Sequence, residues 1–281
     1  MTTRFLVDEG SSTTLPYLLA LPDRVDAATP LLVSVHGVMR RPLEHALAFA
    51  GPARAAGAAL LVPLFSEHRH RRYARLVHPR SGRRSDLALL DTVAAVCRDH
   101  GLPTRPLHLF GYSAGAQFVH RFALAHPARV AALAVGAAGW YTWPDTTLPY
   151  PWGWGGVANW LGAPPDTEAL LRLPTRVWVG ERDDGADEAL RSSPALDALQ
   201  GGSRLVRARR WVQALADAAG ARGLPAPARC LTLPRAGHDF AACARRGLAA
   251  QVTDFFFAPD AAAAKPAGRA ALHRDEALMP V

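Results

Sequence analysis

Short apolar runs alternate with longer amphipathic stretches along most of the chain. Seven runs have the length and the residue types of strands: 15–22, 30–37, 58–65, 106–111, 129–135, 175–180 and 228–234. The run "PLLVSVHG" (30–37) is apolar almost throughout, which is typical of a strand covered on both faces by helices. This alternation predicts an α/β fold with a mostly parallel sheet and helices on both faces.

Apolar residues at helical spacing lie between the strand-like runs. They predict helices over 43–56, 85–100 and 114–127, one around 205–215 and a last one around 248–256. Ser85 or Asp86 is suited to cap the second of these helices. No periodicity is visible from Ala258 onward, so we expect one domain over residues 1–257 and a flexible tail over residues 258–281.

One long interval, residues 136–174, interrupts this alternation. It contains five of the seven tryptophans of the chain and is rich in proline and glycine. Loops of this length in compact α/β domains are usually lids or binding segments, so we expect an aromatic-rich lid. The residues expected to line a substrate pocket are Trp140, Tyr141, Trp143 and Tyr112. Alternatively, the rings of the interval fill the loop against the body of the domain.

The composition is that of a soluble globular protein. Of the 281 residues, 49% are apolar and 20% are charged, and no apolar run is long enough to cross a bilayer. The first residues, "MTTRFLVDEGSSTTLPY", carry an acidic pair where a signal peptide has its apolar stretch. Cys97, Cys230 and Cys243 show no metal-binding spacing. We therefore expect a cytoplasmic protein without a membrane segment or a bound metal, and the oligomeric state is left open.

The basic residues are unevenly distributed. The formal charge is +8, and every basic residue other than Lys265 and the histidines is an arginine. The densest basic segment is "HRHRRYARLVHPRSGRR" (68–84), which has no helix-turn-helix pattern, zinc-finger spacing or aromatic stacking motif. We interpret it as a solvated loop and expect no nucleic-acid partner. The alternatives are the mouth of a site for an anionic substrate and, less favoured, a nucleic-acid patch.

A serine between two glycines follows the fourth strand-like run. Residues 111–115, G-Y-S-A-G, match the pattern G-x-S-x-G and are followed at once by an apolar-periodic helix. A hydroxyl raised above a sheet needs a strained turn, in which side chains two positions away on either side would clash with the neighbouring strand or helix. The turn also leaves backbone N–H groups at a helix N-terminus. This context predicts that Ser113 is a nucleophile.

Such a serine needs a base, and the base needs a carboxylate. Of the eleven histidines, only His238 lies in a glycine-flanked loop downstream of the last strand-like run. The sixth run is followed by the carboxylates Glu181, Asp183, Asp184, Asp187 and Glu188. We predict that Asp183 orients the histidine, because a carboxylate just past a strand end faces the crevice where α/β sheets bind ligands. Asp184 and Asp187 are the alternatives.

An attacked carbonyl also needs two N–H donors for its oxyanion. Ala114, directly after the serine, is expected to supply one. The loop after the second strand-like run is expected to supply the other through Val38 or, alternatively, Met39, since Gly37 permits a close backbone approach. His36 is expected to pack and to form local hydrogen bonds.

The order Ser113, Asp183, His238, preceded by the H-G pair 36–37, resembles the α/β-hydrolase superfamily over about residues 15–257. The resemblance implies an eight-stranded, mostly parallel sheet with Ser113 at the nucleophile elbow. The stretch "HLFGYSAGAQFVHRFALAHPARVAALAVGAAGWYTWPD" is also loosely similar to bacterial polyhydroxybutyrate depolymerase and feruloyl esterase-like proteins.

These residues together predict a serine hydrolase that cleaves a carboxylic ester of a small molecule through an acyl-enzyme. We expect no cofactor, because the sequence has neither a metal-binding helix motif nor a phosphate-binding loop. A thioesterase and a small peptidase are alternatives, since both use the same acyl-transfer chemistry. A non-catalytic ligand-binding protein of the same fold is the alternative from another class.

Overall fold

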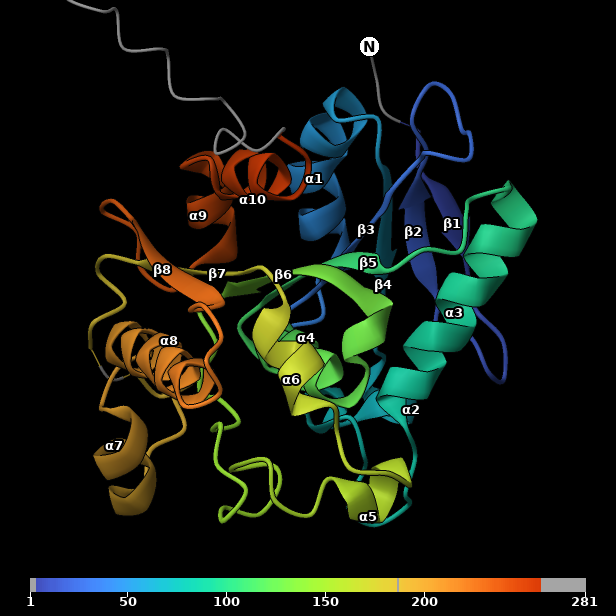
Figure 1. Ribbon diagram of the computed structural model, residues 1–281. Helices are drawn as coiled ribbons and strands as arrows, with labels where there is room; N and C mark the ends of the chain where they lie inside the picture. Colours follow the sequence, from blue (N-terminus) through green and yellow to red (C-terminus); the bar gives the residue numbers. More distant parts are fainter. Residues whose placement is uncertain (1–3, 186, 259–281) are drawn as a thin grey trace, which may run out of the picture.

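The computed structural model describes residues 4–185 and 187–258, and its strands form an eight-stranded sheet (Figure 1). The strands are β1 (Leu6–Asp8), β2 (Tyr17–Ala20), β3 (Leu31–Val35), β4 (Ala59–Pro63), β5 (Leu107–Tyr112), β6 (Val130–Gly136), β7 (Thr175–Gly180) and β8 (Ala228–Leu233). Their order across the sheet is β1-β2-β4-β3-β5-β6-β7-β8. The pairs β1–β2 and β2–β4 are antiparallel and the other pairs are parallel, which confirms the predicted mostly parallel sheet.

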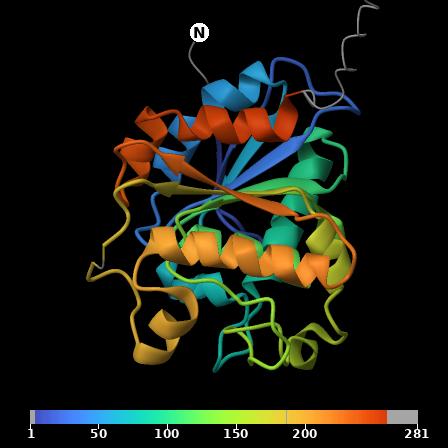
Figure 2. The same cartoon turned by 60° about the vertical axis from the view of Figure 1, so that its left-hand side comes forward.

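Helices cover both faces of the sheet, as predicted. They are α1 (Pro42–Ala55), α2 (Glu67–His70), α3 (Ser85–His100), α4 (Ala114–Ala125), α5 (Ala158–Leu161), α6 (Thr167–Arg172), α7 (Pro194–Gln200), α8 (Arg204–Gly220), α9 (Phe240–Arg245) and α10 (Leu248–Phe257). Figure 2 shows α1 and α10 above the sheet and α3 and α8 below it. Within the described residues, no helix combines the length and the apolar character that crossing a bilayer requires.

Some short elements were not predicted from the pattern. Strand β1 has three residues at the edge of the sheet and two of them are exposed, so it has no apolar run. Helices α2, α7 and α9 have four, seven and six residues, too few for a helical repeat to show. The predicted tail lies, from residue 259 onward, outside the described residues.

The predicted cap of α3 is wrong. The N-cap residue is Arg84, and no side chain caps the helix. Ser85 is the first helical residue, and the buried carboxylate of Asp86 instead accepts hydrogen bonds from Arg84 Nε at 2.8 Å and His126 Nε2 at 2.7 Å. A buried carboxylate needs charged or polar donors, and this need outweighs the local capping preference.

The carboxyl ends of the parallel strands define one edge of the sheet. All residues of β3 are buried, as are the last four of β5 and of β7, so these strand ends are held by core packing on both faces. The loops after β3, β5, β7 and β8 therefore leave the sheet at the same edge, where ligands bind in open α/β sheets.

Candidate active site

Ser113 lies on the sharp turn between β5 and α4. Its backbone has φ 55° and ψ −113°, a strained combination for a residue with a side chain. The turn is held by a hydrogen bond of 2.7 Å from the Ser113 N–H to the carbonyl of Gly136, on the neighbouring strand β6. Strands β5 and β6 thus fix the serine at the sheet edge.

The two flanking glycines are required by space. A Cβ on Gly111 would lie 2.3 Å from the carbonyl oxygen of Gly115, and a Cβ on Gly115 would lie 2.1 Å from the carbonyl oxygen of Val35 on β3. Both distances are far inside van der Waals contact. The predicted reason for the glycines, a clash with the neighbouring strand and helix, holds at both positions.

Ser113, His238 and Asp183 form one continuous chain of hydrogen bonds. Nε2 of His238 lies 3.0 Å from Oγ of Ser113, and Nδ1 lies 2.9 Å from Oδ2 of Asp183. The Asp183 side chain is only 2% exposed, so its charge is shielded from water. Of the alternative carboxylates, Asp184 is exposed and Asp187 binds another side chain.

The other carboxylate oxygen of Asp183 is bound by a residue that the sequence did not single out. Arg204, at the start of α8, lies with Nη1 3.1 Å from Oδ1 of Asp183 and 2.5 Å from Oδ2 of Asp187. Its hydrogen bonds and charge lower the pKa of Asp187 to about 2. Burial by itself lowers the pKa of the Arg204 guanidinium. The hydrogen bonds and charges of the two carboxylates have the larger effect, so the pKa is raised. Arg204 therefore orients Asp183 from behind.

The predicted pocket residue Tyr112 lies beside the imidazole. Its ring stacks on that of His238, with centroids 5.5 Å apart and planes inclined by 26°. The Tyr112 hydroxyl lies 3.4 Å from Sγ of Cys243, on α9. Tyr112 thus limits the rotation of the imidazole and also lines the cavity at Ser113.

The loop after β3 faces Ser113. A Cβ on Gly37 would be only 3.6 Å from Cβ of Ser113, so the backbone passes close to the serine. His36 holds this loop: its Nδ1 donates to the Gly37 carbonyl at 2.8 Å, and its Nε2 accepts from the Phe65 N–H at 3.1 Å. Burial lowers the pKa of His36 to about 4, so the ring is neutral, as this pair of roles requires.

The amides of Val38 and Ala114 border the same cavity. Within the described residues, no hydrogen bond uses the N–H of either residue. The Ala114 N–H is the first of α4, where a helix leaves its amides without internal partners. These two amides are available to a ligand.

A cavity of about 370 Å³ opens directly above Ser113. Its apolar or small lining residues are Gly37, Val38, Met39, Tyr112, Ala114, Gly139, Ala189 and Phe240. Its polar lining residues are Arg40, Arg41, Glu44, His45, Ser113, Gln117, Arg204, His238 and Asp239. Val38 and Met39 are more than half exposed, which gives the mouth an apolar rim. The described residues contain no cluster of His, Cys, Asp and Glu arranged to hold a metal ion.

Several solved structures of similar architecture are hydrolases. The chain matches poly(aspartic acid) hydrolase-1 from Sphingomonas sp. KT-1 with a TM-score of 0.75 at 22% identity, covering 89% of this chain and 98% of that one. It matches LpqC, a poly(3-hydroxybutyrate) depolymerase from Bordetella parapertussis, with a TM-score of 0.72 at 24% identity and 93% of both chains. The chain has the α/β-hydrolase fold. S-formylglutathione hydrolase from Agrobacterium tumefaciens also matches, with a TM-score of 0.52, 15% identity, and 89% and 91% of the two chains.

Comparisons of sequence give a different result from the comparison of structures. No protein-family model matches it, and no curated protein is significantly similar to it. The resemblance predicted from the sequence therefore agrees with the fold found by comparing structures. In this chain the glycine-flanked serine lies between β5 and α4.

The aromatic interval of this α/β-hydrolase fold differs from the prediction. Of residues 136–174, only Gly139 is among the residues that line the cavity, so Trp140, Tyr141 and Trp143 do not line it. Tyr141 is fully buried and stacks on Trp211 of α8, with centroids 4.6 Å apart. Trp143 packs against the hydrophobic core. The interval is attached to the body of the domain by these rings, as the alternative interpretation proposed.

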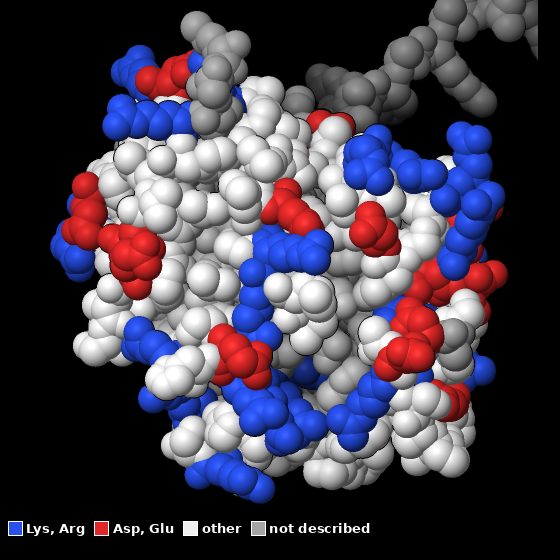
Figure 3. Space-filling view, turned by 180° about the vertical axis from the view of Figure 1, so that it is seen from behind, with Lys and Arg blue, Asp and Glu red and all other residues white. Residues whose placement is uncertain are grey.

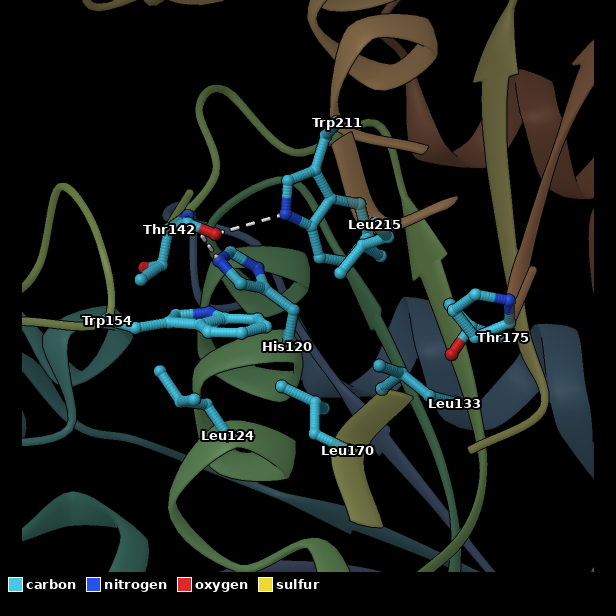
Figure 4. Close-up of a pocket in the computed structure, with 10 residues that line it drawn as sticks. His120, Leu124, Leu133, Thr142, Trp154, Leu170, Thr175, Trp211 and Leu215 are labelled. Carbon is cyan, nitrogen blue, oxygen red and sulfur yellow. Dashed lines mark hydrogen bonds between the residues drawn. The ribbon is translucent and has the colours of Figure 1, made fainter. Parts of the chain in front are cut away.

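A small closed cavity beneath the interval shows how it is attached (Figure 4). The Trp211 indole donates to the Thr142 carbonyl at 3.0 Å, and the Thr142 N–H donates to Nε2 of His120 at 3.0 Å. Nδ1 of His120 in turn lies 2.8 Å from the carbonyl of Ala116 on α4. The cavity measures only about 10 Å³ and is otherwise lined mostly by leucines and Trp154, so it is packing space rather than a ligand site.

Proposed function

We propose that the chain is a serine hydrolase that cleaves carboxylic esters through an acyl-enzyme. The observation that carries the proposal is the unbroken chain of contacts from Ser113 Oγ to Nε2 of His238 and from Nδ1 to Asp183, at 3.0 and 2.9 Å. A serine, an imidazole and a buried carboxylate in this order form a nucleophile, its base and the group that orients the base.

In the first step, Oγ of Ser113 attacks the ester carbonyl while Nε2 of His238 removes the hydroxyl proton. The Nδ1–H of His238 donates to Oδ2 of Asp183, which fixes the tautomer and stabilises the imidazolium. The imidazolium then gives its proton to the departing alcohol oxygen, and the bond between carbonyl carbon and that oxygen breaks. An acyl group remains on Ser113.

The negative charge on the carbonyl oxygen is taken up by the backbone. The N–H groups of Ala114 and Val38 border the cavity beside Ser113 and have no partner within the described residues. The positive end of α4 adds a favourable field at Ala114. Removal of one such donor costs about 3 kcal/mol of transition-state stabilisation in enzymes of this chemistry.

Water completes the cycle. His238 removes a proton from a water molecule, the hydroxide adds to the acyl carbonyl, and the same imidazolium returns a proton to Oγ of Ser113 as the acid leaves. The cavity at Ser113 is open to solvent at the exposed side chains of Val38 and Met39, so water reaches the acyl group. The triad and the two amides therefore supply every group that these steps use.

Labelling with a fluorophosphonate probe tests the proposal. The wild-type protein is expected to react once at Ser113 and to hydrolyse p-nitrophenyl esters, whereas Ser113→Ala is expected to do neither. Ser81→Ala changes an exposed serine away from the cavity lining and is expected to behave as wild type. Acyl-CoA thioesters and aminoacyl anilides are compared in the same assay. A folded wild-type protein that is not labelled, or that turns over thioesters or anilides in place of esters, would contradict it.

A further inference from the structure

The arginine-rich segment 68–84 does not form a single basic patch. Arg69 donates to the backbone carbonyls of Ser11 and Ser12, Arg71 pairs with Glu67, and Arg84 pairs with Asp86. These arginines are used in local structure. Arg75 is different, because it lies near two arginines from other parts of the chain.

Arg75, Arg121 and Arg191 form a group that we call the arginine cluster. Burial lowers the pKa of Arg121 to about 10, and the charges of Arg75 and Arg191 act in the same direction. Burial also lowers the pKa of Arg75, with further contributions from Arg191 and Arg72. The geometry agrees, because Arg121 donates to the carbonyl of Ala74, next to Arg75, and Arg121 and Arg191 both lie over the ring of Trp140.

The described residues give the cluster no acidic partner. None of its three members takes part in an ion pair within residues 4–185 and 187–258. Arg121 donates to Thr142 Oγ1 at 2.8 Å and to the Ala74 carbonyl at 2.6 Å, while its Nη2 is buried without a partner. Of the three, Arg121 is fully buried, Arg75 is half-buried and Arg191 is exposed. A buried charge such as that of Arg121 is expensive without a counter-charge, and an anion at this place would offset that cost.

Aromatic rings hold two members of the cluster in place. The guanidinium of Arg121 lies 4.3 Å and that of Arg191 5.4 Å from the ring centre of Trp140. Arg191 also lies 5.2 Å from the ring centre of Trp152. Stacking of this kind orients a planar guanidinium while its N–H groups remain available for hydrogen bonds.

The cluster adjoins the cavity at Ser113 through three separate segments. Gln117 lines the cavity one helical turn before Arg121, Gly139 lines it directly before Trp140, and Ala189 lines it two residues before Arg191. On the face drawn in Figure 3, basic side chains gather around a hollow in the lower half of the view. The cluster therefore lies next to the residues that form this wall of the cavity.

We propose that the arginine cluster is a subsite for an anionic group, a carboxylate or a phosphate, on the part of the ester substrate remote from the scissile bond. This inference rests on the proposed function, and it names the class of substrate. Guanidinium groups bind both anions with paired, charge-assisted hydrogen bonds. A nucleic acid fits less well, because only Arg191 of the three is exposed, whereas a phosphate backbone is bound by several exposed arginines.

Matched pairs of esters test the subsite. In the first series, monoethyl esters of linear dicarboxylic acids of increasing length are compared with the same esters whose carboxylate is replaced by a primary amide. In the second series the carboxylate is on the alcohol, as in acetylated hydroxy acids and their amides. In the third series an acetylated phosphoalcohol is compared with the acetylated free diol. These series distinguish the acyl side from the alcohol side and carboxylate from phosphate.

At least one series is expected to show a kcat/KM about tenfold or more higher for the anionic member, since a hydrogen bond to a charged group contributes at least that much. Arg191→Gln and Arg75→Gln are expected to reduce this ratio, chiefly through KM, and added salt is expected to reduce it in the wild type. Arg105→Gln removes an exposed arginine at the opposite end of β5 and is expected to leave every ratio unchanged.

Three results are decisive against the subsite. Equal kcat/KM values within every pair, or a preference that both Arg191→Gln and Arg75→Gln retain, would overturn it while esterase activity and probe labelling remain. Absence of both labelling and ester turnover in the wild type would overturn the proposed function and the subsite with it. Labelling of each variant at the wild-type rate shows that the variant is folded.

Discussion

Two groups of arginines in this protein have opposite surroundings. Arg204 lies between two carboxylates, at 3.1 Å from Asp183 and 2.5 Å from Asp187. The arginine cluster of Arg75, Arg121 and Arg191 has aromatic rings and backbone carbonyls but no carboxylate within the described residues. An arginine paired with carboxylates stabilises the fold. An arginine without a carboxylate lowers the stability, and a bound anion would restore it. Under the proposed function, Arg204 positions Asp183, whereas the arginine cluster receives an anionic group of the substrate.

The largest expected effect is on kcat for ester hydrolysis, the reaction in which both groups of arginines are proposed to act. His238→Ala is expected to lower kcat by at least roughly 10⁴-fold, because Ser113 loses its base. The variant is measured against an ester without charge, so that the arginine cluster does not contribute. His68→Ala, at an exposed histidine, is the matched control and keeps the wild-type rate. A small decrease for His238→Ala would assign the base to another group.

The next effect concerns the compensated arginine. Arg204→Met is expected to lower the free energy of unfolding by about 3 kcal/mol, because two carboxylates lose their partner and that of Asp183 is buried. The free energy is measured by urea denaturation, together with kcat, which is expected to fall as Asp183 loses its orientation. Arg210→Met removes an exposed arginine from the same helix and is expected to have little effect on either. If the two variants were equally stable, the ion pairs of Arg204 would not contribute to the stability of the fold.

The pH dependence of the free energy of unfolding distinguishes the ion pair of Arg204 and Asp187 from the buried imidazoles. The free energy of unfolding is expected to fall as the pH decreases from 6.5 towards 4, because burial lowers the pKa of His36 from 6.5 to about 4 and only the unfolded chain takes up the proton in this range. The contribution of His36 is about 3 kcal/mol. The pair of Arg204 and Asp187 does not contribute, since the pKa of Asp187 is about 2.

Urea denaturation at several pH values measures this slope. His36→Asn is expected to reduce the slope, whereas His68→Asn, at an exposed position, is expected to leave it unchanged. Burial also lowers the pKa values of His45, His70, His108 and His120, so part of the slope is expected to remain. A slope that is the same in His36→Asn as in the wild type would show that His36 does not contribute.

The smallest effect is expected at the uncompensated arginines. Arg191→Gln is expected to change the free energy of unfolding by less than about 1 kcal/mol, because relief of repulsion offsets the lost stacking on Trp140 and Trp152. Urea denaturation of this variant beside Arg204→Met gives the contrast directly. A loss as large as that of Arg204→Met would make Arg191 a structural residue and would remove the difference between the two groups.

Apart from the three-residue β1, the sequence predicted the strands of the sheet, and it predicted the contacts of Ser113, because both depend on local pattern. Apolar runs marked the buried strands, and glycines at positions 111 and 115 marked a turn that no other residue permits. His238 and Asp183 were found because parallel strands end at one edge, so that the loops after them must meet there. The fold family followed from the same order of residues.

Other parts of the site depend on tertiary packing that no pattern shows. Arg204 begins a helix that carries several further arginines, and nothing local distinguishes it from them. The aromatic interval was misread because tryptophan supplies packing area as readily as it lines a pocket. The rings of Trp140 and Tyr141 attach the interval to α4 and α8, and neither residue nor Trp143 is among those that line the cavity.

Helix α4 carries Ser113 at its N-terminal turn and Arg121 eight residues later. Because a helix rises about 1.5 Å per residue, roughly 12 Å of rigid backbone separate the two positions along its axis. With the anionic group of the substrate held at the arginine cluster, as proposed, this spacing fixes the distance that the substrate must span. Hydrolysis is then expected to be fastest at one methylene count and to decline for homologues on either side.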